Sequence, residues 1–426
     1  MILYTFILWL LLPFALLRLW RRSRKDARYG RRWAERLGYG SFLEPGALWV
    51  HAVSVGEVRA ATPLIRALLQ DHPDVRILIT TTTLTGAAQV EMLFGDHVRH
   101  RFAPFDLPSA VGRFLIRVQP RAAVILETEI WPSLFQALHR AHIPLLLANV
   151  RLSDRSYRGY RRFGRLVAAT FAIPSVIAAQ TQTDLERLQA LGAPEKRLHV
   201  TGNMKFEVVP TAGLREAAQS LRYGWNDRPV WVAASTHQGE EDIVLDAYAS
   251  LKTTFPTLLL ILVPRHPERF EAVGKLCRQR KFTVAERSLG LPVTDATEIL
   301  LGDTMGELML FFAAGDCAFI GGSLVKTGGH NPLEALALGI PTVFGPHMFN
   351  FAEIARLTVT AGAGRQIRGP EELSGAIARY LGDREARRAA GCAGEELVRQ
   401  NQGACARTLA LLEPLLRQLP PAREDP

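Results

Sequence analysis

The sequence has few cysteines and lacks the short motifs that mark several enzyme classes. Its 426 residues include four cysteines, with no C-x-x-C pair and no zinc-ligand spacing: Cys277, Cys317, Cys392 and Cys405. A secreted framework of disulfide bonds is therefore disfavoured, and a reducing cytoplasm fits better. A GxGxxG turn and a P-loop are also absent. The first absence argues against a dinucleotide dehydrogenase.

Metal-binding patterns are missing as well. His237, His330 and His347 form no H-x-x-x-H pair, and no Asp-x-Asp motif occurs in the polar loops that follow the predicted strands. Paired histidines and carboxylates are the usual ligands of zinc and of harder cations. We therefore predict no metal site and no cofactor.

The formal net charge is +10, and many basic residues fall in two clusters. One cluster lies near the N-terminus: Arg18, Arg21, Arg22, Arg24, Lys25, Arg28, Arg31, Arg32 and Arg36. The other lies mid-chain: Arg151, Arg155, Arg158, Arg161, Arg162 and Arg165. Such clusters suit nucleic acid, anionic lipid or phosphorylated ligands. Because no nucleic-acid-binding signature accompanies them, we favour anionic lipid and expect no nucleic-acid partner; solvated helix faces are the alternative.

Residues 1–17 carry no charged side chain and are nearly all apolar. As a helix they would be roughly 25 Å long, slightly short of the ~30 Å hydrocarbon core of a bilayer. We predict a membrane anchor over residues 1–22, with the arginine-rich side and the rest of the chain in the cytoplasm. A buried core helix is the alternative. A cleaved signal peptide fits less well, because a basic start and an A-x-A-like site are missing.

Apolar runs alternate with helical stretches along two halves of the chain. Runs in the first half are typical of buried parallel strands: 48–53, 76–81, 122–126, 144–149 and 175–179. Predicted helices between them include 58–70 and 132–141. The same alternation restarts and continues: 229–234, 258–263, 298–301, 317–320 and 342–344. Two such halves predict two doubly wound, Rossmann-like α/β domains.

The domain boundaries follow from composition. We place the first domain at 23–206 and the second at 229–417. The polar stretch between them, 207–228, contains Pro and Gly and is interpreted as a hinge. Residues 418–426 are rich in Pro and charge, which predicts a loose tail.

Polar loops follow several of the predicted strands: 51–57, 127–132, 235–240, 264–267 and 321–323. In open α/β sheets, ligands bind at the carboxyl ends of the strands. Two sets of such loops predict a ligand site in a cleft between the domains.

The segment from Thr327 to Pro346 carries the strongest ligand signal. Its glycines allow the backbone to approach a ligand closely. Asn331 and Pro332 mark a helix start as N-cap and first-turn residues, and a helix start attracts phosphate. Glu334, in the first turn, can accept hydrogen bonds from sugar hydroxyls. Phosphate beside ribose predicts a nucleotide site.

There are four further candidates, and three of them have a structural alternative. Glu57 lies at a strand-to-helix turn and could be a general base with a raised pKa, or only stabilise a helix start. Arg265, with His266, suits a phosphate or carboxylate, or a surface ion pair. Lys205 could reach an anion between the domains. The turn 302–308 could border a base or ribose, or simply connect a strand to a helix.

Taken together, these segments resemble one family, the 3-deoxy-D-manno-octulosonic acid (Kdo) transferases of lipopolysaccharide synthesis, which are membrane-associated GT-B glycosyltransferases. The resemblance runs from the apolar N-terminus to about residue 415. Seven motifs carry it: HAVSVGE (51–57), ETEIWPS (127–133), NVRLSDRS (149–156), ASTHQGEE (234–241), LVPRHPERF (262–270), GDTMGEL (302–308) and GGHNPLEA (328–335). Ala103 and Glu207 depart from the expected Leu and Asp, and neither undermines the predicted sites.

The resemblance implies roles for particular residues. Glu57 would be the general base that deprotonates the acceptor hydroxyl, and Glu127 and Lys205 would assist the transition state. The site for cytidine monophosphate (CMP) would comprise a larger set: Arg265, His266, Met305, Gly306, Glu307, Leu308, Asn331, Pro332, Leu333 and Glu334.

The resemblance also implies an activity. Kdo would pass from a CMP-Kdo donor to a lipid A precursor (lipid IVA), by metal-independent inverting transfer at the cytoplasmic face of the inner membrane, with membrane phospholipid as a further partner. Two alternatives stay open. One is a membrane-associated glycosyltransferase that uses a different nucleotide sugar, and the other is a membrane-anchored nucleotide-sugar binding protein without catalysis.

Overall fold

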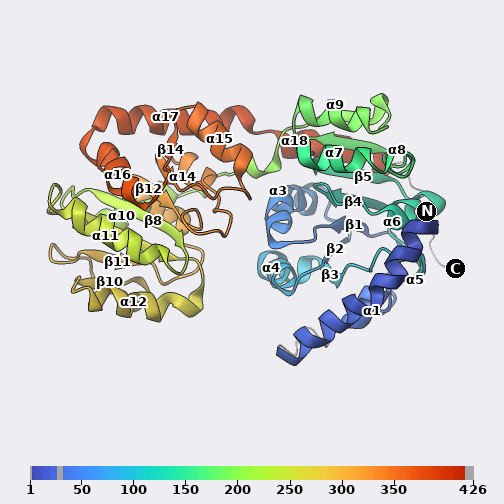
Figure 1. Ribbon diagram of the computed structural model, residues 1–426, viewed down its shortest axis with the longest axis horizontal. Helices are drawn as coiled ribbons and strands as arrows, with labels where there is room; N and C mark the ends of the chain where they lie inside the picture. Colours follow the sequence, from blue (N-terminus) through green and yellow to red (C-terminus); the bar gives the residue numbers. More distant parts are fainter. Residues whose placement is uncertain (1, 26–31, 418–426) are drawn as a thin grey trace. The chain divides into compact units, whose positions relative to one another are not determined.

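The computed structural model describes residues 2–25 and 32–417, which divide into two compact units (Figure 1). Among the described residues, unit 1 comprises 2–25, 32–207 and 402–417, and unit 2 comprises 208–401. Each unit contains a seven-stranded parallel sheet with helices on both faces. The predicted pair of doubly wound α/β domains is therefore confirmed.

Unit 1 is built on a sheet with strand order β3-β2-β1-β4-β5-β6-β7. Its strands are β1 (Leu48–His51), β2 (Ile77–Thr81), β3 (Arg99–Phe102), β4 (Ala122–Leu126), β5 (Leu145–Val150), β6 (Val176–Ala179) and β7 (Leu198–Val200). Every residue of β1, β2, β4 and β5 is buried. Helices cover both faces of the sheet, so these strands can be apolar throughout.

The helices of unit 1 form two layers. One face of the sheet packs against α3 (Val55–Asp71), α4 (Leu84–Phe94) and α18 (Ala404–Arg417). The other packs against α5 (Pro108–Val118), α6 (Pro132–Arg140), α8 (Gly164–Phe171) and α9 (Gln182–Ala190). The remaining elements are α1 (Ile2–Lys25), α7 (Asp154–Arg161) and the short helices η1 (Trp33–Leu37), η2 (Gly95–His97), η3 (Glu195–Arg197) and η4 (Met204–Phe206).

Unit 2 repeats this plan, with strand order β10-β11-β9-β8-β12-β13-β14. Its strands are β8 (Val230–Thr236), β9 (Leu259–Pro264), β10 (Val284–Glu286), β11 (Ile299–Leu301), β12 (Cys317–Ile320), β13 (Thr342–Phe344) and β14 (Gly364–Gln366). One face packs against α11 (Glu240–Lys252), α12 (Phe270–Gln279), α16 (Leu373–Gly382) and α17 (Arg384–Asn401). The other packs against α10 (Leu214–Arg222), α13 (Leu308–Ala313), α14 (Leu333–Leu336) and α15 (Ala352–Thr360). Three short helices complete the unit: η5 (Pro267–Arg269), η6 (Arg287–Leu289) and η7 (Pro370–Glu372).

The predicted strands are all present, and their ends shift by no more than two residues. The four strands that sequence reasoning missed, β3, β7, β10 and β14, are the edge strands of the two sheets. Each is only three or four residues long and is partly exposed. An edge strand that faces water on one side needs no continuous apolar run, so the apolar pattern did not reveal it.

The structure corrects two of the predicted domain boundaries. Residues 208–228 belong to unit 2 and contain α10, whose Ala218 packs with Phe311 and Phe312 of α13. The chain then returns to unit 1 at Gln402, so α18 belongs to the first domain and not to the second. The reason is burial, because the apolar face of α18 packs against α3. The predicted tail at 418–426 lies outside the described residues.

The apolar helix α1 has the length and composition to cross a membrane. Leu3–Arg21 has a mean hydropathy of 1.8, and none of it is buried. The alternative of a buried core helix is therefore wrong. One bond ties the start of α1 to the rest of unit 1, since the Tyr4 hydroxyl donates to Asp106 Oδ2 at 2.7 Å.

The N-terminal basic cluster does not face outward as a whole. Arg36 is buried, donates to the Thr82 carbonyl (2.8 Å) and stacks on Phe102. Arg32 pairs with Glu35 (2.7 Å). These two arginines hold η1 on β3. Arg36 is buried and Arg32 is partly exposed, and contact of the cluster with anionic lipid stays a prediction. Arg28 and Arg31 lie outside the described residues. In the mid-chain cluster, most side chains are exposed: Arg155, Arg158, Arg161, Arg162 and Arg165.

Candidate active site

Glu57 lies near the start of α3, just after strand β1. Ser54 caps this helix, and its Oγ accepts from the Glu57 N–H (3.4 Å). The Glu57 carboxylate accepts in turn from the Val53 N–H (2.7 Å) and from the Ser54 hydroxyl (3.1 Å). This arrangement is close to a capping box. It fixes the carboxylate at the carboxyl end of an inner strand.

The pKa of Glu57 is raised to about 8. Burial of the side chain is the largest cause, and the negative charges of Glu127 and Glu129 add to it. The hydrogen bonds from Val53 and Ser54 oppose the shift. A carboxylate with this pKa is a far stronger base than an exposed glutamate, and it titrates near neutral pH.

Glu127 directly follows β4, in a backbone conformation that non-glycine residues seldom adopt. Its φ is +57°, in the left-handed region, which costs an L-residue roughly 1–2 kcal/mol. Such residues concentrate at functional sites. The Lys205 ammonium lies 2.8 Å from Glu127 Oε1. The structure thus brings Glu57, Glu127 and Lys205 into one electrostatic cluster.

Two asparagines position Lys205 on η4. Asn149 Oδ1, on β5, accepts from the Met204 N–H (3.0 Å), and Asn203 Oδ1 accepts from the Lys205 N–H (2.9 Å). Met204 and Phe206 on either side are buried. The Lys205 ammonium therefore projects from a turn that these hydrogen bonds hold in place. One of the two asparagines, Asn149, comes from a motif far away in the sequence.

Sequence reasoning did not single out three further groups in unit 1: His51, Glu129 and Trp131. The Trp131 indole donates to Glu129 Oε2 (2.7 Å) and stands edge-on to the His51 ring, with centroids 4.9 Å apart. Burial lowers the pKa of His51 to about 3, so this ring is neutral, and its Nδ1 lies 2.8 Å from Thr80 Oγ1. All three groups belong to the HAVSVGE and ETEIWPS motifs, whose spacing was the available signal.

In unit 2, the strand-end loops gather three histidines. His237 follows β8, His266 follows β9, and His330 lies in the glycine-rich segment after β12. The Nε2 atoms of His237 and His330 are 2.8 Å apart with the rings stacked, and the His266 ring meets His237 edge-on at 5.3 Å. Burial lowers the pKa of His237; the charges of His266, Arg265 and Arg269 add to this, and that of Glu241 opposes it. Arg265 and His266, which were predicted together, therefore lie beside further basic side chains.

Glu240 connects the loops after β8 and β12. Sequence reasoning did not single out this residue. It is fully buried and accepts hydrogen bonds from four backbone N–H groups: those of His237 (2.9 Å), Gly322 (2.6 Å), Ser323 (3.0 Å) and Leu324 (2.9 Å). A carboxylate has about four acceptor positions, so its capacity is filled. Glu240 thereby joins the loops after β8 and β12.

The glycine-rich segment differs from the prediction by one residue at its helix. α14 begins at Leu333 with Pro332 in the N-cap position, whereas Asn331 was predicted there. Asn331 still caps the helix, because its Oδ1 accepts from the Leu333 N–H (3.1 Å). Leu333 is buried in the core, so only its backbone is available. A helix of four residues has a weak dipole, and nearby cations would have to supply much of the attraction for phosphate.

The turn at Met305–Leu308 follows β11, which neighbours β9. Met305 is exposed, and Gly306 has a φ of +87°. Glu307 pairs with Arg287 (2.7 Å), which lowers the pKa of this carboxyl. Glu307 therefore braces the turn, and Leu308 starts α13.

Known proteins resemble the chain over almost its whole length. A family model described as 3-deoxy-D-manno-octulosonic-acid transferase (kdotransferase) matches residues 31–208. A 3-deoxy-D-manno-octulosonic acid transferase of Haemophilus influenzae is 43% identical over 420 residues, which is 97% of this chain and 98% of the relative. A 3-deoxy-D-manno-octulosonic acid transferase of Bordetella pertussis is 36% identical, over 96% of this chain and 98% of the relative. The chain belongs to the Kdo transferase family. It is therefore a glycosyltransferase, and the non-catalytic alternative is wrong.

Solved structures of more distant proteins support the fold of this Kdo transferase. The UDP-GlcNAc 2-epimerase of Neisseria meningitidis matches with a TM-score of 0.57 at 15% identity, over 86% of this chain and 100% of that one. A glycosyltransferase of Rickettsia africae matches with a TM-score of 0.55 at 12% identity, over 89% and 100%. At such identities the likeness concerns the fold alone, that of two parallel-sheet α/β units of the GT-B type.

The part of the Kdo transferase that the structure describes contains no group of three or more His, Cys, Asp or Glu side chains arranged to hold a metal ion. Of the carboxylates at the strand ends, Glu127 pairs with Lys205, whereas Glu57 and Glu240 accept hydrogen bonds from backbone N–H groups.

Proposed function

We propose that this Kdo transferase moves Kdo from CMP-Kdo to a lipid A precursor, lipid IVA, by metal-independent inverting transfer. The observation that carries the proposal is Glu57. This carboxylate is buried, has a pKa raised to about 8, and is held by two hydrogen bonds at the carboxyl end of β1. A group of this kind can take a proton from an acceptor hydroxyl near neutral pH.

The proposed step forms one bond at the anomeric carbon and breaks another. The acceptor oxygen bonds to the anomeric carbon of Kdo as its proton passes to Glu57, and the bond from that carbon to the CMP phosphate breaks. Attack from the face opposite the leaving group inverts the anomeric carbon. Positive charge develops on the sugar and negative charge on the phosphate. The Glu127–Lys205 pair would stabilise this charge separation, with Lys205 near the phosphate or the Kdo carboxylate.

The proposed CMP site lies in unit 2. Arg265 and His266 would meet the phosphate, since both follow β9 beside a cluster of histidines. Asn331, Pro332 and the Leu333 backbone would border the phosphate as well, and Glu334 would accept from ribose hydroxyls. The Met305–Leu308 turn would border the base. The exposed mid-chain arginines would meet the acceptor's phosphates.

The test compares two variants of unit 1. Glu57→Gln keeps the shape of the side chain and removes the base, so transfer should fall by about 10²–10⁴-fold while CMP affinity stays unchanged. Glu129→Gln, a second part-buried carboxylate nearby, should cost less. CMP release and the lipid product would be followed by mass spectrometry. Retained transfer in Glu57→Gln, together with lost CMP binding, would overturn the assignment.

The donor requires its own experiment, since a general base at Glu57 would serve other nucleotide sugars equally well. A panel of CMP-Kdo and UDP-sugars should give lipid-dependent release of CMP alone. Release of UDP at a comparable rate would assign a different donor. Arg265→Gln should weaken CMP binding by about 10–100-fold, because a charge-assisted bond contributes roughly 1.5–3 kcal/mol.

We further propose that α1 anchors the enzyme at the cytoplasmic face by embedding in one leaflet. Tyr4 bonds to Asp106 of the globular part. If α1 crossed the bilayer, its fourth residue would lie about 25 Å from the arginine-rich end, on the far side. In intact cells, a membrane-impermeant maleimide should not label Leu3→Cys. Labelling from the periplasm would show that α1 spans the membrane.

A further inference from the structure

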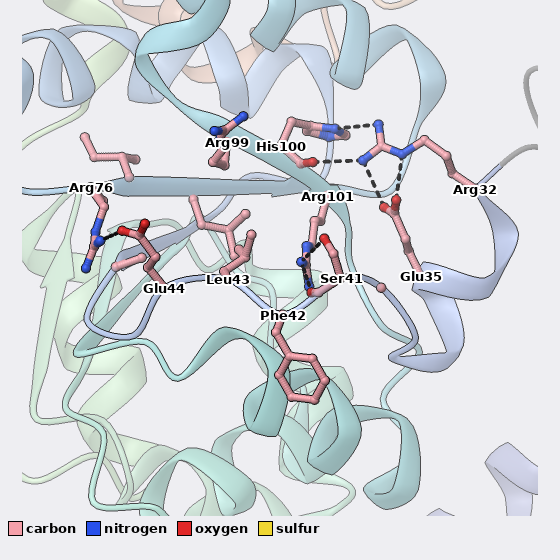
Figure 2. A pocket seen from close by; sticks show the side chains of 14 residues that line it. Arg32, Glu35, Ser41, Phe42, Leu43, Glu44, Arg76, Arg99, His100 and Arg101 are labelled. Atoms are coloured by element: carbon pink, nitrogen blue, oxygen red, sulfur yellow. Dashed lines mark hydrogen bonds and ion pairs between the residues drawn. The ribbon is translucent and has the colours of Figure 1, made fainter. Parts of the chain in front are cut away.

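A pocket of about 580 Å³ opens beside β3, at the edge of the unit 1 sheet (Figure 2). Its lining includes Ala47, Arg76 and Ile77, which precede or begin β1 and β2. Glu57 and Glu127 follow the carboxyl ends of their strands. Strands of one parallel sheet share their direction, so the lining reaches the opposite end of the strands from the candidate active site. The pocket therefore needs an explanation of its own.

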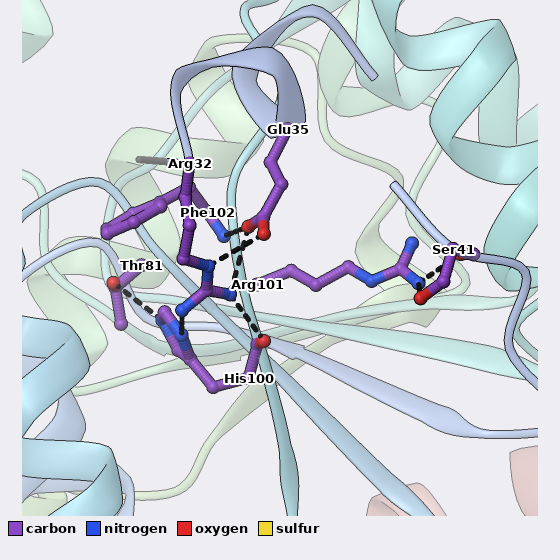
Figure 3. Close-up of polar contacts among 7 residues, drawn as sticks. All are labelled: Arg32, Glu35, Ser41, Thr81, His100, Arg101 and Phe102. Carbon is purple, nitrogen blue, oxygen red and sulfur yellow. Dashed lines mark hydrogen bonds and ion pairs between the residues drawn. The ribbon is translucent and has the colours of Figure 1, made fainter. Parts of the chain in front are cut away.

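Four arginines line this pocket, and carboxylates neutralise two of them. Arg32 forms a two-pronged pair with Glu35, at 2.7 and 3.0 Å, and also donates to the His100 carbonyl (2.8 Å) (Figure 3). Arg76 pairs with Glu44 (Figure 2). These two pairs use both acidic side chains of the lining.

The other two arginines, Arg99 and Arg101, pair with no carboxylate among the described residues. Arg101 is 7% exposed, and its guanidinium donates only to the carbonyl and hydroxyl oxygens of Ser41 (Figure 3). Burial lowers the pKa of Arg101; the charge of Glu35 opposes this shift, and that of Arg32 adds to it. Arg99 is exposed at the start of β3 and has no partner in the described part of the chain. A buried cation without an anion is costly, so the pocket carries excess positive charge that an anion would neutralise.

Phe42, which lines the pocket, belongs to a cluster of two aromatic rings and two further arginines. Phe42 is 69% exposed, and Tyr39 is 48% exposed. Arg117 stacks on both rings, at 5.3 and 5.5 Å, and Arg113 stacks on Tyr39 at 4.7 Å. Exposed aromatic side chains beside arginines are typical of the boundary between membrane and water. Apolar α1 belongs to the same unit and is tied to it through Asp106.

We propose that this pocket binds the phosphate group of a membrane phospholipid. Arg99 and Arg101 donate to the phosphate oxygens, because a guanidinium matches phosphate geometry with two N–H groups at once. Phe42 and Leu43 border the glycerol and the first acyl carbons. Such a site lies apart from the reacting groups and would orient the enzyme on an anionic membrane.

The test uses the full-length enzyme in neutral detergent and isothermal titration calorimetry. The probes are dihexanoyl phosphatidylglycerol below its critical micelle concentration, glycerol 3-phosphate and inorganic phosphate. The lipid should bind saturably and more tightly than either soluble anion. Arg99→Gln should weaken lipid binding by about ten-fold or more, which corresponds to about 1.4 kcal/mol. Arg101→Lys keeps the positive charge and loses the planar guanidinium that donates two N–H groups at once, so it should weaken lipid binding as well.

Arg140→Gln is the matched control, since Arg140 is exposed on α6 and has no partner among the described residues. Its lipid affinity should equal that of the native enzyme. Arg99 is at the surface, so Arg99→Gln should fold, and a thermal melt checks this. Unchanged lipid affinity in a folded Arg99→Gln variant would overturn the proposal.

Two further outcomes would also overturn it. Inorganic phosphate that binds as tightly as the lipid would assign the pocket to a soluble anion. A raised KM for the lipid acceptor in Arg99→Gln, with unchanged phosphatidylglycerol binding, would assign the pocket to the substrate.

Discussion

The two units of this Kdo transferase place a glutamate at the same point of the same fold. In each, a Gly-Glu pair follows an inner strand at the start of the next helix. Gly56 and Glu57 lie in the first turn of α3 after β1, whereas Gly239 is the N-cap of α11 and Glu240 its first residue after β8. Both side chains are buried, and burial raises both pKa values. Glu57 accepts two hydrogen bonds, whereas Glu240 accepts four.

The difference shows that the number of fixed donors decides what a buried carboxylate can do. Four backbone N–H groups fill every acceptor position of Glu240, which becomes a structural brace. Glu57 has two donors and faces the negative charge of Glu127, so it binds a proton near neutral pH. A local sequence of Gly-Glu is therefore compatible with either role, and the surrounding loops decide between them.

The largest predicted effect on stability concerns the brace. Glu240→Ala leaves four N–H groups without their acceptor, and the loops after β8 and β12 should loosen. We expect unit 2 to lose more than about 3 kcal/mol of unfolding free energy, since each unsatisfied buried donor costs about 1–3 kcal/mol. Hydrogen exchange at Gly322–Leu324 measures the loss. Glu57→Ala should lower the unfolding free energy of unit 1 by less than Glu240→Ala lowers that of unit 2. Equal losses would contradict the distinction between a base and a structural brace.

The second prediction concerns the cation that balances Glu127. Lys205→Met removes the partner 2.8 Å from Glu127, so the uncompensated charge should raise the pKa of Glu57 further. The limb of the pH–rate profile on which the base loses its proton should move from about 8 to higher pH. For every pH unit that this limb moves, the rate at pH 7 should fall about ten-fold. The control is Lys252→Met, which breaks a similarly exposed pair with Glu298 in unit 2. The same displacement in both variants would contradict the assignment.

The third prediction concerns stability and pH. The pKa of Glu57 is about 8 in the folded chain and about 4.3 in an unfolded one. The folded state therefore holds the proton more tightly, and stability falls as the pH rises through this range. Glu57→Gln cannot ionise at this position. The thermal midpoint of the variant should therefore rise relative to that of the native enzyme as the pH increases from 6 to 9. A difference that does not change with pH would rule out the raised pKa.

The smallest predicted effect concerns the cap. Ser54→Ala removes the N-cap oxygen of α3 and should cost about 1 kcal/mol. It also removes a hydrogen bond that lowers the pKa of Glu57, so the same limb of the pH–rate profile should move slightly upward. Unit 2 has Gly239 at the equivalent cap with no side-chain bond. Chemical denaturation and the pH–rate profile test both expectations, and Ser54→Thr should preserve both properties.

The order of elements, the two-domain plan and most loop positions could be predicted because apolar runs report burial directly. Inner strands are buried on both faces, so most of their residues are apolar. Edge strands such as β3, with its Arg99 and Arg101, contact the sheet on one side only and escaped notice. The return of α18 to unit 1 also escaped, because its apolar face could have packed on either domain.

The sequence by itself determined which residues deserve study. Seven motifs in one order identify the family, two of them contain Glu57 and Glu127, and the resemblance adds Lys205. Only the tertiary structure decided what surrounds each of them. Hydrogen-bond donors, neighbouring charges and burial come from loops that lie far apart along the chain. A pKa depends on all three at once. For the same reason, two Gly-Glu pairs that each follow an inner strand became a proposed base in one unit and a brace in the other.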